Sequence, residues 1–270
     1  MYENIKVIVC DIDGTIARQS SEPTPVCIEC LEKLREMGYL IALASGRCIE
    51  DLEIKYKTWG MKDQFDFIIA LNGVELWDNL TKQKSEYLLM KKEWLREIVE
   101  LMAPFPHHTS MYIPGGYMSD NPKDIERHTK KHSERKRVFA ETDYDFCKED
   151  RGGIMFRVTE ESMPLVEAHL AAHPSEHFVG FKTQPDLMEF AHKDCSKGVA
   201  LEKFCERHNI SLDDVMAFGD TTNDIGMLKI CHGICMINGS DDAKAVSERL
   251  SDKPDTEEGF VDFCEKYLYR

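Results

Sequence analysis

Short apolar runs alternate with helically spaced apolar positions along the first third of the chain. The β-branched run at residues 5–10 predicts a buried strand. Apolar side chains recur at helical spacing over residues 25–37, and Gly38 follows them as a typical helix C-terminal cap. Residues 39–44 and 67–70 predict two further strands, with a helix between them. This alternation is typical of a parallel sheet that is covered by helices on both faces.

The last third of the chain resumes the same alternation. In order, the pattern predicts a helix at 197–208, a strand at 214–218, a helix at 224–230, a strand at 233–237 and an amphipathic helix at 259–268. The two ends of the chain therefore predict two halves of one α/β core.

The middle of the chain, residues 83–191, has a different pattern. Prolines and glycines gather between residues 104 and 122. Residues 154–158 and 178–181 predict strands, and residues 163–172 predict a helix. This stretch therefore predicts a separate α+β unit that is inserted into the α/β core. The expected domains are a core made of residues 1–82 and 192–270 and an inserted domain made of residues 83–191.

Composition narrows the possible classes of protein. The chain has 270 residues, of which 42% are hydrophobic and 31% are charged, as in an ordinary globular protein. Its formal net charge of -15 disfavours binding to nucleic acid, whose phosphates are also negative. Apolar runs such as residues 7–10 fall far short of the ~20 residues that a membrane span needs. No secretory pattern is visible at the N-terminus, so we expect a cytoplasmic protein without a membrane partner.

Ten cysteines are many for such a chain, but their arrangement does not indicate a disulfide framework. Cys27 and Cys30 belong to an apolar stripe at helical spacing, together with Val26, Leu31 and Leu34. We therefore expect buried, reduced thiols, because a free cysteine packs as a small hydrophobic side chain. A redox or zinc role for the pair is the less favoured alternative, because zinc sites usually need four ligands.

Two carboxylates come directly after the first predicted strand. Asp11 and Asp13 lie at its C-terminal end, the edge of an open α/β sheet where ligands bind. Gly14 then allows the chain to turn sharply. Carboxylates this close repel each other unless one is protonated or a cation neutralises them. The pair suits a nucleophile beside a general acid/base, or a site for a hard metal ion such as Mg²⁺.

Three further motifs are expected near the same edge. Residues 219–224, Gly-Asp-Thr-Thr-Asn-Asp, follow the strand at 214–218 and add two carboxylates and an amide. Ser45-Gly46-Arg47 follows another strand, and Lys197 begins a helix. Each motif alone has an ordinary explanation, as a turn, a helix cap or a solvated lysine. Together they supply the groups that hold a phosphate and a divalent metal ion.

With these motifs the sequence resembles the haloacid dehalogenase (HAD) superfamily, and within it the Cof-type, sugar-phosphatase-like branch with an inserted C2 cap. The family's D-x-D-G-T motif matches residues 11–15, and its strand-ending Ser matches Ser45. Its Lys-Gly and G-D-x-x-N-D motifs match Lys197-Gly198 and residues 219–224. Asn72-Gly73 resembles the branch's N-G-A segment, although Val74 replaces the alanine. The resemblance implies a Rossmann-like parallel-sheet core with an α+β C2-type cap domain.

The resemblance also implies a two-step phosphoryl transfer. Asp11 would attack phosphorus and form an aspartyl-phosphate, while Asp13 would protonate the leaving alkoxide and then activate water. Ser45 and the Lys197 ammonium would hold the phosphoryl oxygens. Such chemistry depends mostly on positioning and charge neutralisation.

A cofactor and a substrate site follow from the same resemblance. Asp11, Asp220 and the backbone carbonyl of Asp13 would bind Mg²⁺, and Asp224 would orient the metal site. The residues expected to contact the substrate are Gly14, Thr15, Gly46, Arg47, Asn72 and Asn223. A small phosphorylated metabolite is the expected partner.

Three functions remain open on the sequence. The favoured one is a Mg²⁺-dependent phosphatase that acts on small metabolites, sugar phosphates among them. A phosphomutase of the phosphomannomutase type shares the D-x-D-G-T motif and the cap. A non-catalytic binding protein on the same fold is the third, and it is disfavoured because every motif residue is present. The sequence does not indicate an oligomeric state.

Overall fold

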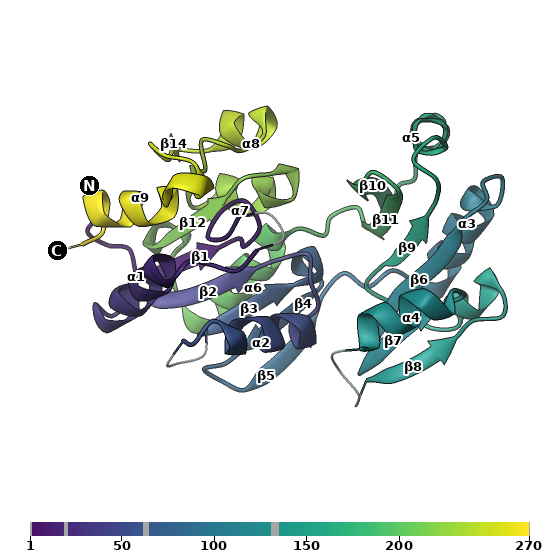
Figure 1. Ribbon diagram of the computed structural model, residues 1–270, viewed down its shortest axis with the longest axis horizontal. Helices are drawn as coiled ribbons and strands as arrows, with labels where there is room; N and C mark the ends of the chain where they lie inside the picture. The colour runs from purple at the N-terminus through teal and green to yellow at the C-terminus, as the bar shows by residue number, and fades with distance from the viewer. Residues whose placement is uncertain (1, 19–20, 62–64, 131–134, 270) are drawn as a thin grey trace. The chain divides into compact units, whose positions relative to one another are not determined.

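The computed structural model describes residues 2–18, 21–61, 65–130 and 135–269. The chain divides into two compact units (Figure 1). The core unit comprises Met1–Tyr87 and Ser196–Arg270, and the inserted unit comprises Leu88–Cys195. Both ends of the chain therefore belong to one unit.

The boundaries between the units lie a few residues later than the sequence pattern predicted. Residues 83–86 were expected in the inserted domain, but they form the strand β5 (Gln83–Glu86), which pairs with β4 (Glu75–Asp78) of the core unit. Residues 192–195 were expected in the core, but they belong to the inserted unit. The strand β11 ends only at His192, which pairs with Phe178 in that unit. Strand pairing, which apolar periodicity does not reveal, sets both boundaries.

The core unit contains an eight-stranded sheet with the order β14-β13-β12-β1-β2-β3-β4-β5. Its remaining strands are β1 (Val7–Cys10), β2 (Leu40–Ala44), β3 (Phe67–Ala70), β12 (Val215–Gly219), β13 (His232–Cys235) and β14 (Arg249–Leu250). Neighbours from β14 to β3 are parallel, whereas β4 and β5 add an antiparallel hairpin at one edge. The predicted parallel sheet is confirmed. The hairpin was not predicted, because β5 is a polar strand with little apolar signal.

Helices cover both faces of this sheet. They are α1 (Pro25–Glu36), α2 (Ile49–Thr58), α6 (Lys197–His208), α7 (Ile225–Ile230), α8 (Asp241–Val246) and α9 (Gly259–Tyr267). The strand β1 shows why two layers are needed, because its successive side chains point to opposite faces. Ile8 packs in a cluster with residues of α1, α2 and α9, while Val9 packs in a second cluster with residues of α6 and α7. The central strands are thereby buried on both sides.

The inserted unit is an α+β structure with its own core. Its six-stranded sheet has the order β10-β11-β9-β6-β7-β8. The strands are β6 (His108–Ile113), β7 (Gly116–Ser119), β8 (Lys136–Phe139), β9 (Ile154–Arg157), β10 (Phe178–Gln184) and β11 (Leu187–His192). The helices are α3 (Lys92–Met102), α4 (Pro122–Thr129) and α5 (Met163–Ala172). Met111, Phe156 and Phe190 are buried together in a cluster with residues of α3 and α5.

All ten cysteines lie within the described ranges, and all are free thiols. Cys27 and Cys30 are buried on α1, as the apolar stripe predicted. Val26 is not part of the buried stripe, because this residue is 51% exposed. Within the described ranges, the group of residues that could hold a metal ion contains carboxylates and no cysteine.

The edge hairpin is fastened to α6 through one buried carboxylate. The side chain of Asp78, on β4, is fully buried, and its Oδ2 accepts hydrogen bonds from Arg207 Nη1 (2.9 Å) and His208 Nε2 (2.8 Å). Its Oδ1 accepts from the backbone of Leu80 and Thr81. Burial alone would raise the pKa of Asp78, but the hydrogen bonds from His208, Arg207 and Thr81 lower it to about 2.

Replacing Asp78 by Asn is expected to lower the free energy of unfolding at pH 7 by about 2–3 kcal/mol, since Arg207 and His208 lose their anionic partner. A carboxyl whose pKa is lowered by folding stabilises the protein above its unfolded pKa and loses this effect at lower pH. The difference from wild type should therefore shrink as the pH falls from 5 to 3. Urea unfolding at several pH values measures it, with Asp252→Asn at an exposed ion pair as the control. A difference that is independent of pH would contradict this role.

Candidate active site

Three neighbouring strands end at the same edge of the core sheet. Their order is β12-β1-β2, and Asp220, Asp11 and Ser45 are the residues that follow them directly. The backbone N–H of Asp11 donates to the Phe218 carbonyl, and that of Ser45 donates to the Ile69 carbonyl. Sheet pairing thus continues one residue beyond the strands and fixes where these side chains begin. The sequence motifs that were expected at one edge do lie there.

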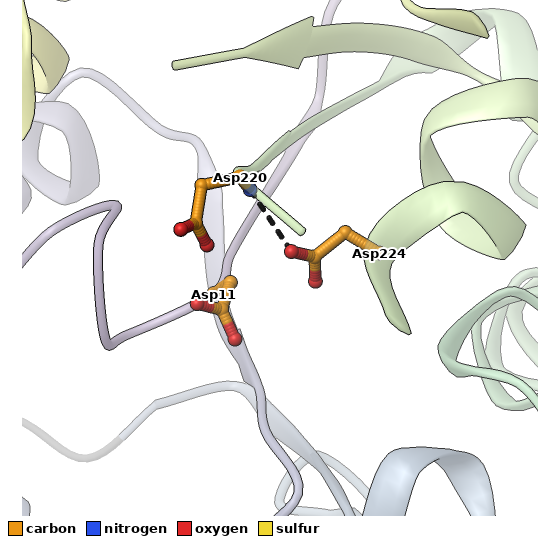
Figure 2. Close-up of side chains that lie close together, drawn as sticks. All are labelled: Asp11, Asp220 and Asp224. Atoms are coloured by element: carbon orange, nitrogen blue, oxygen red, sulfur yellow. Dashed lines mark hydrogen bonds between the residues drawn. The ribbon is translucent and has the colours of Figure 1, made fainter. Parts of the chain in front are cut away.

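Asp11, Asp220 and Asp224 form a buried acidic cluster (Figure 2). Each contributes a ligand atom, and these oxygens lie within 4.8 Å of one another. Asp220 Oδ1 is buried without a hydrogen-bond partner. In the described part of the chain, this is the group of side chains that could hold a metal ion. The all-oxygen donor set and the unpartnered carboxylate oxygen fit a hard divalent cation such as Mg²⁺.

Lys197 is the cation of this cluster. Its side chain is fully buried at the first position of α6, where the Ser196 hydroxyl accepts from Val199 N and caps the helix. Lys197 Nζ donates to Asp11 Oδ1 (2.5 Å) and to Asp224 Oδ1 (2.6 Å). Burial alone would lower the pKa of Lys197, but the two carboxylates raise it above its ordinary value. The ammonium therefore stays charged, and it fixes the orientation of both partners.

One lysine does not balance three carboxylates. Burial raises the pKa of Asp11 to about 7, although Lys197 acts in the opposite direction. Burial also raises the pKa of Asp220 to about 8, and the charges of Asp11 and Asp224 add to this effect. The cluster therefore binds protons more readily than isolated carboxylates do. The same excess of negative charge favours binding of a divalent cation.

Asp224 shapes the loop that carries Asp220. Asp224 Oδ2 accepts hydrogen bonds from the backbone N–H groups of Asp220 (2.9 Å) and Thr221 (3.0 Å), as the dashed line in Figure 2 shows for Asp220. Its other carboxylate oxygen is bound to Lys197. This side chain therefore links the loop after β12 to the start of α6.

Two glycines allow the loops to approach one another. Gly14 has a φ of +96°, and a Cβ at this position would lie 2.3 Å from Asp220 Oδ2. Gly73 has a φ of +105°, and its Cβ would lie 2.0 Å from the Ser196 carbonyl oxygen, next to Lys197. A side chain at either position would collide with the site and strain the backbone. The N–H groups of Gly14 and Thr15 donate to the backbone carbonyls of Ala17 and Ile12 within the turn. Gly14 therefore contributes space beside Asp220, and its own N–H is engaged locally.

Asp13 does not share the environment of Asp11. Its Oδ2 accepts from Arg47 Nη2 at 2.8 Å, so that its side chain joins the loop after β2. Its side chain is 28% exposed, whereas that of Asp11 is 10% exposed. Arg47 Nε is buried and has no hydrogen-bond partner. Ser45 Oγ lies close by and accepts from Arg47 N (3.3 Å).

Three more of the predicted residues, Gly46, Asn72 and Asn223, lie close together. Asn72 adopts a left-handed conformation with a φ of 54°, and its Oδ1 accepts from Asn223 Nδ2 at 3.1 Å. A Cβ on Gly46 would lie 3.2 Å from Asn72 Nδ2. Gly46, Asn72 and Asn223 therefore form one group, built from the loops after β2, β3 and β12. Thr15 Oγ1 is buried without a hydrogen-bond partner.

Sequence reasoning missed two residues at this site. Asn238 Nδ2 donates to the Gly14 carbonyl at 2.9 Å, and its Oδ1 accepts from Asp255 N at 2.9 Å, so that it clamps the turn after Asp11. Its only signal was its position in the segment after β13. Lys55, on α2, lies 3.9 Å from Asp13 Oδ1 through its Nζ. No motif marks Lys55, because its proximity to Asp13 depends on how α2 packs.

Comparison with known protein families identifies the class of protein to which this fold and site belong. A family model of haloacid dehalogenase-like hydrolases matches residues 8–263. The chain belongs to this family, and the resemblance that the motifs indicated is confirmed.

Individual relatives agree with this assignment. The chain is 26% identical over 251 residues to pyridoxal phosphate phosphatase YbhA of Escherichia coli, covering 89% of this chain and 90% of the relative. It is 25% identical over 254 residues to HMP-PP phosphatase of Yersinia pestis, covering 84% and 82% of the two chains. A solved haloacid dehalogenase-like hydrolase from Bacteroides thetaiotaomicron shares the fold with a TM-score of 0.79 at 20% identity, covering 98% and 100%. The predicted enzyme class, a phosphoric monoester hydrolase of this family, is supported by these phosphatases.

Asp220→Asn is expected to raise the free energy of unfolding by about 1–3 kcal/mol at pH 8 when divalent cations are chelated, because it removes a buried negative charge. Folding raises the pKa of this carboxyl to about 8, so in wild type its contribution becomes increasingly unfavourable as the pH rises from about 4 to 8. The gain should therefore be larger at pH 8 than at pH 5. Urea unfolding in EDTA tests this, with the exposed Asp241→Asn as the control. If Asp220→Asn instead lowered the free energy of unfolding at pH 8, repulsion among the three carboxylates would not be the dominant interaction of Asp220.

Proposed function

We propose that the chain is a Mg²⁺-dependent phosphatase that hydrolyses phosphomonoesters of small metabolites, sugar phosphates among them, through an aspartyl-phosphate intermediate on Asp11. The observation that carries this proposal is the contact of Lys197 Nζ with Asp11 Oδ1 at 2.5 Å inside a buried acidic cluster. A fixed ammonium beside a buried carboxylate can orient that carboxylate and also bind a phosphoryl oxygen.

Mg²⁺ would be held by Asp11, Asp220 and the backbone carbonyl of Asp13, with Asp224 orienting the Asp220 loop. When bound, the ion neutralises charge on the phosphoryl group. Asp224 already binds Lys197 through Oδ1 and the Asp220 N–H through Oδ2, which suits an orienting role. The unpartnered Oδ1 of Asp220 is the oxygen that supports this assignment.

In the first step, a carboxylate oxygen of Asp11 attacks phosphorus, and the bond from phosphorus to the leaving oxygen breaks. Asp13 gives its proton to the departing alkoxide, so that an alcohol and an aspartyl-phosphate are formed. Lys197 and Ser45 hold phosphoryl oxygens during the transfer. Arg47 Nε, a buried donor without a partner, is a further group that suits an anionic substrate.

In the second step, Asp13 takes a proton from a water molecule whose oxygen attacks phosphorus. The bond between phosphorus and Asp11 breaks, which releases inorganic phosphate and restores the carboxylate. Asp13 can serve both steps, because its carboxyl is partly exposed and lies outside the acidic cluster. Asp11 is held by Lys197 and Asp13 by Arg47, so the two carboxyls are positioned by different elements.

Substrate recognition would be divided between the two units. Around the phosphate, the proposed contacts are Gly14, Thr15, Gly46, Arg47, Asn72 and Asn223. The inserted unit, Leu88–Cys195, would act as the cap that selects the leaving group. The relatives' names include a pyridoxal phosphate phosphatase and an HMP-PP phosphatase, so the substrate panel should extend beyond sugar phosphates.

The proposed location is the cytoplasm. All ten cysteines are described and none forms a disulfide, which suits a reducing compartment. Within the described residues, no helix is long and apolar enough to cross a membrane.

Asp11→Asn is expected to abolish phosphate release, because an amide cannot serve as the attacking carboxylate. The assay measures inorganic phosphate from p-nitrophenyl phosphate and from a panel of sugar phosphates and pyridoxal phosphate, with and without Mg²⁺. Asp241→Asn, at an exposed position, serves as the matched control. Normal turnover by Asp11→Asn would refute the nucleophile assignment. Formation of an isomerised sugar phosphate without free phosphate would instead identify a phosphomutase.

Mg²⁺ is expected to raise the Tm of the wild-type protein and to raise that of Asp220→Asn much less, because binding to the folded state stabilises it. Differential scanning fluorimetry over a Mg²⁺ titration measures both shifts without any substrate. Asp241→Asn should respond as wild type does. Equal shifts in wild type and Asp220→Asn would remove Asp220 from the metal site.

A further inference from the structure

One loop contacts both of the loops that carry the proposed metal ligands. It consists of residues 236–240, directly after β13, and is named the bridging loop here. Asn238 Nδ2 donates to the Gly14 carbonyl at 2.9 Å. Two residues later, Ser240 N donates to the Asp220 carbonyl at 2.7 Å. The bridging loop therefore joins the loop after β1 to the loop after β12.

The bridging loop is itself held in a defined shape. Met236 N donates to the Gly219 carbonyl at 2.9 Å, which continues the pairing of β12 with β13, and Gly239 N donates to the Met236 carbonyl at 2.8 Å. Asn238 lies at the surface, yet both ends of its amide are engaged, since its Oδ1 accepts from Asp255 N at 2.9 Å. The donor end of this amide is therefore oriented by a contact at its other end.

The turn at Gly14 depends on contacts from outside because glycine does not restrict its own backbone. Gly14 has a φ of +96°, in a region that only glycine adopts freely. Its N–H donates to the Ala17 carbonyl at 2.7 Å, which holds the peptide that contains the Asp13 carbonyl. Asn238 holds the next peptide through the Gly14 carbonyl. Together the two contacts restrict rotation about Gly14, and with it the direction of the Asp13 carbonyl.

The backbone of Asp220 is held on both sides. Its N–H donates to Asp224 Oδ2 at 2.9 Å, and its carbonyl accepts from Ser240 N. Its side-chain Oδ1, in contrast, is buried without a hydrogen-bond partner. Because the bridging loop also binds Gly14, it sets the separation between Asp220 and the turn after β1.

We propose that Asn238 is a positioning residue that raises the affinity of the site for Mg²⁺ by holding the loop after β1 against the loop after β12. This inference rests on the metal assignment of the proposed function, in which Asp220 and the Asp13 carbonyl are ligands. Mg²⁺ demands near-ideal octahedral geometry, so ligands on two loops bind it tightly only where their separation is fixed beforehand. Hydrogen bonds that orient metal ligands are typically worth about 10–100-fold in metal affinity.

A purely structural role for Asn238 would leave the metal affinity unchanged. Asn238 also ties the loop after β1 to Asp255, and Arg18 Nη2 makes a second link to this segment at the Thr256 carbonyl (2.9 Å). If Asn238 served only as such a link, its loss would lower the Tm of the metal-free protein without changing the Kd for Mg²⁺. Asn238→Ala alters no charge, so the electrostatic attraction between the site and a cation stays the same.

The test measures the Kd for Mg²⁺ by isothermal titration calorimetry on the full-length, metal-free protein, together with the Tm in EDTA. Asn238→Ala is expected to raise the Kd about tenfold, at the lower end of the range for an orienting hydrogen bond, because Asn238 contacts a neighbour of the ligand. Asn238→Ser, whose side chain is too short to reach both partners, should also bind Mg²⁺ more weakly. This second variant keeps the test decisive if the first does not fold.

Asn79→Ala is the matched control at the opposite edge of the core sheet. Asn79 Nδ2 donates to the Phe65 carbonyl at 3.0 Å, just before β3, and its Oδ1 accepts from Lys82 Nζ. The same substitution therefore removes the same kind of contact away from the acidic cluster. It is expected to lower the Tm in EDTA and to leave the Kd for Mg²⁺ within about twofold of wild type, since distant sites act independently.

An unchanged Kd for Mg²⁺ in the Asn238 variants would overturn the proposal, whatever their Tm. An equal loss of affinity in Asn79→Ala would overturn it as well, because the effect would then follow from stability alone. If wild type bound Mg²⁺ but released no phosphate from any substrate of the panel, the proposed function would fail, and the Kd values would still decide the role of Asn238. Absence of Mg²⁺ binding by wild type would overturn the metal assignment and this inference together.

Discussion

The core unit has to hold three buried carboxylates close together around one lysine. Asp11, Asp220 and Asp224 repel one another in surroundings that exclude water, and Lys197 offsets only part of that repulsion. Such a cluster persists only where the backbone is rigid. The parallel pairing of β1 with β12 supplies this rigidity, because Cys10 lies opposite Phe218 immediately before the acidic loops. Burial of the sheet on both faces stabilises the fold and offsets the repulsion among the three carboxylates.

Much of this arrangement could be predicted, because it depends on patterns within short segments of the sequence. The strands that end just before Asp11, Ser45 and Asp220 are apolar runs, and α6 begins at Lys197, as its pattern predicted. Parallel strands place their carboxyl ends at one edge, so the convergence of these motifs follows from sheet topology alone. The glycine after Asp13 was likewise identified as a turn. Gly14 also leaves room for Asp220 Oδ2. This could not be predicted, because it depends on the distance between two loops.

Features that depend on tertiary contacts could not be predicted from the sequence. The polar hairpin β4–β5 is fixed by Asp78, whose partners Arg207 and His208 lie far along the chain on α6. Asn238 and Lys55 reach the loop after β1 from a later loop and from a helix. No spacing rule connects such residues, because their proximity is a product of packing. Sequence patterns therefore locate the carboxylates and Lys197, and the structure adds contacts such as those of Asn238 and Lys55.

The distribution of charges around Asp11 and Asp13 explains how a chain with a negative net charge could bind an anion. When all three carboxylates of the inner cluster are ionised, they and the ammonium carry a net charge of two negative units, which one divalent cation would balance. The outer group has the opposite sign, because Arg47 and Lys55 outweigh the single charge of Asp13. A phosphate dianion that approaches Asp11 would therefore meet carboxylates neutralised by that cation, with the positive charges of Arg47 and Lys55 beside them. The net charge of -15 repels extended polyanions, but this local order of charges decides what happens to one phosphate group.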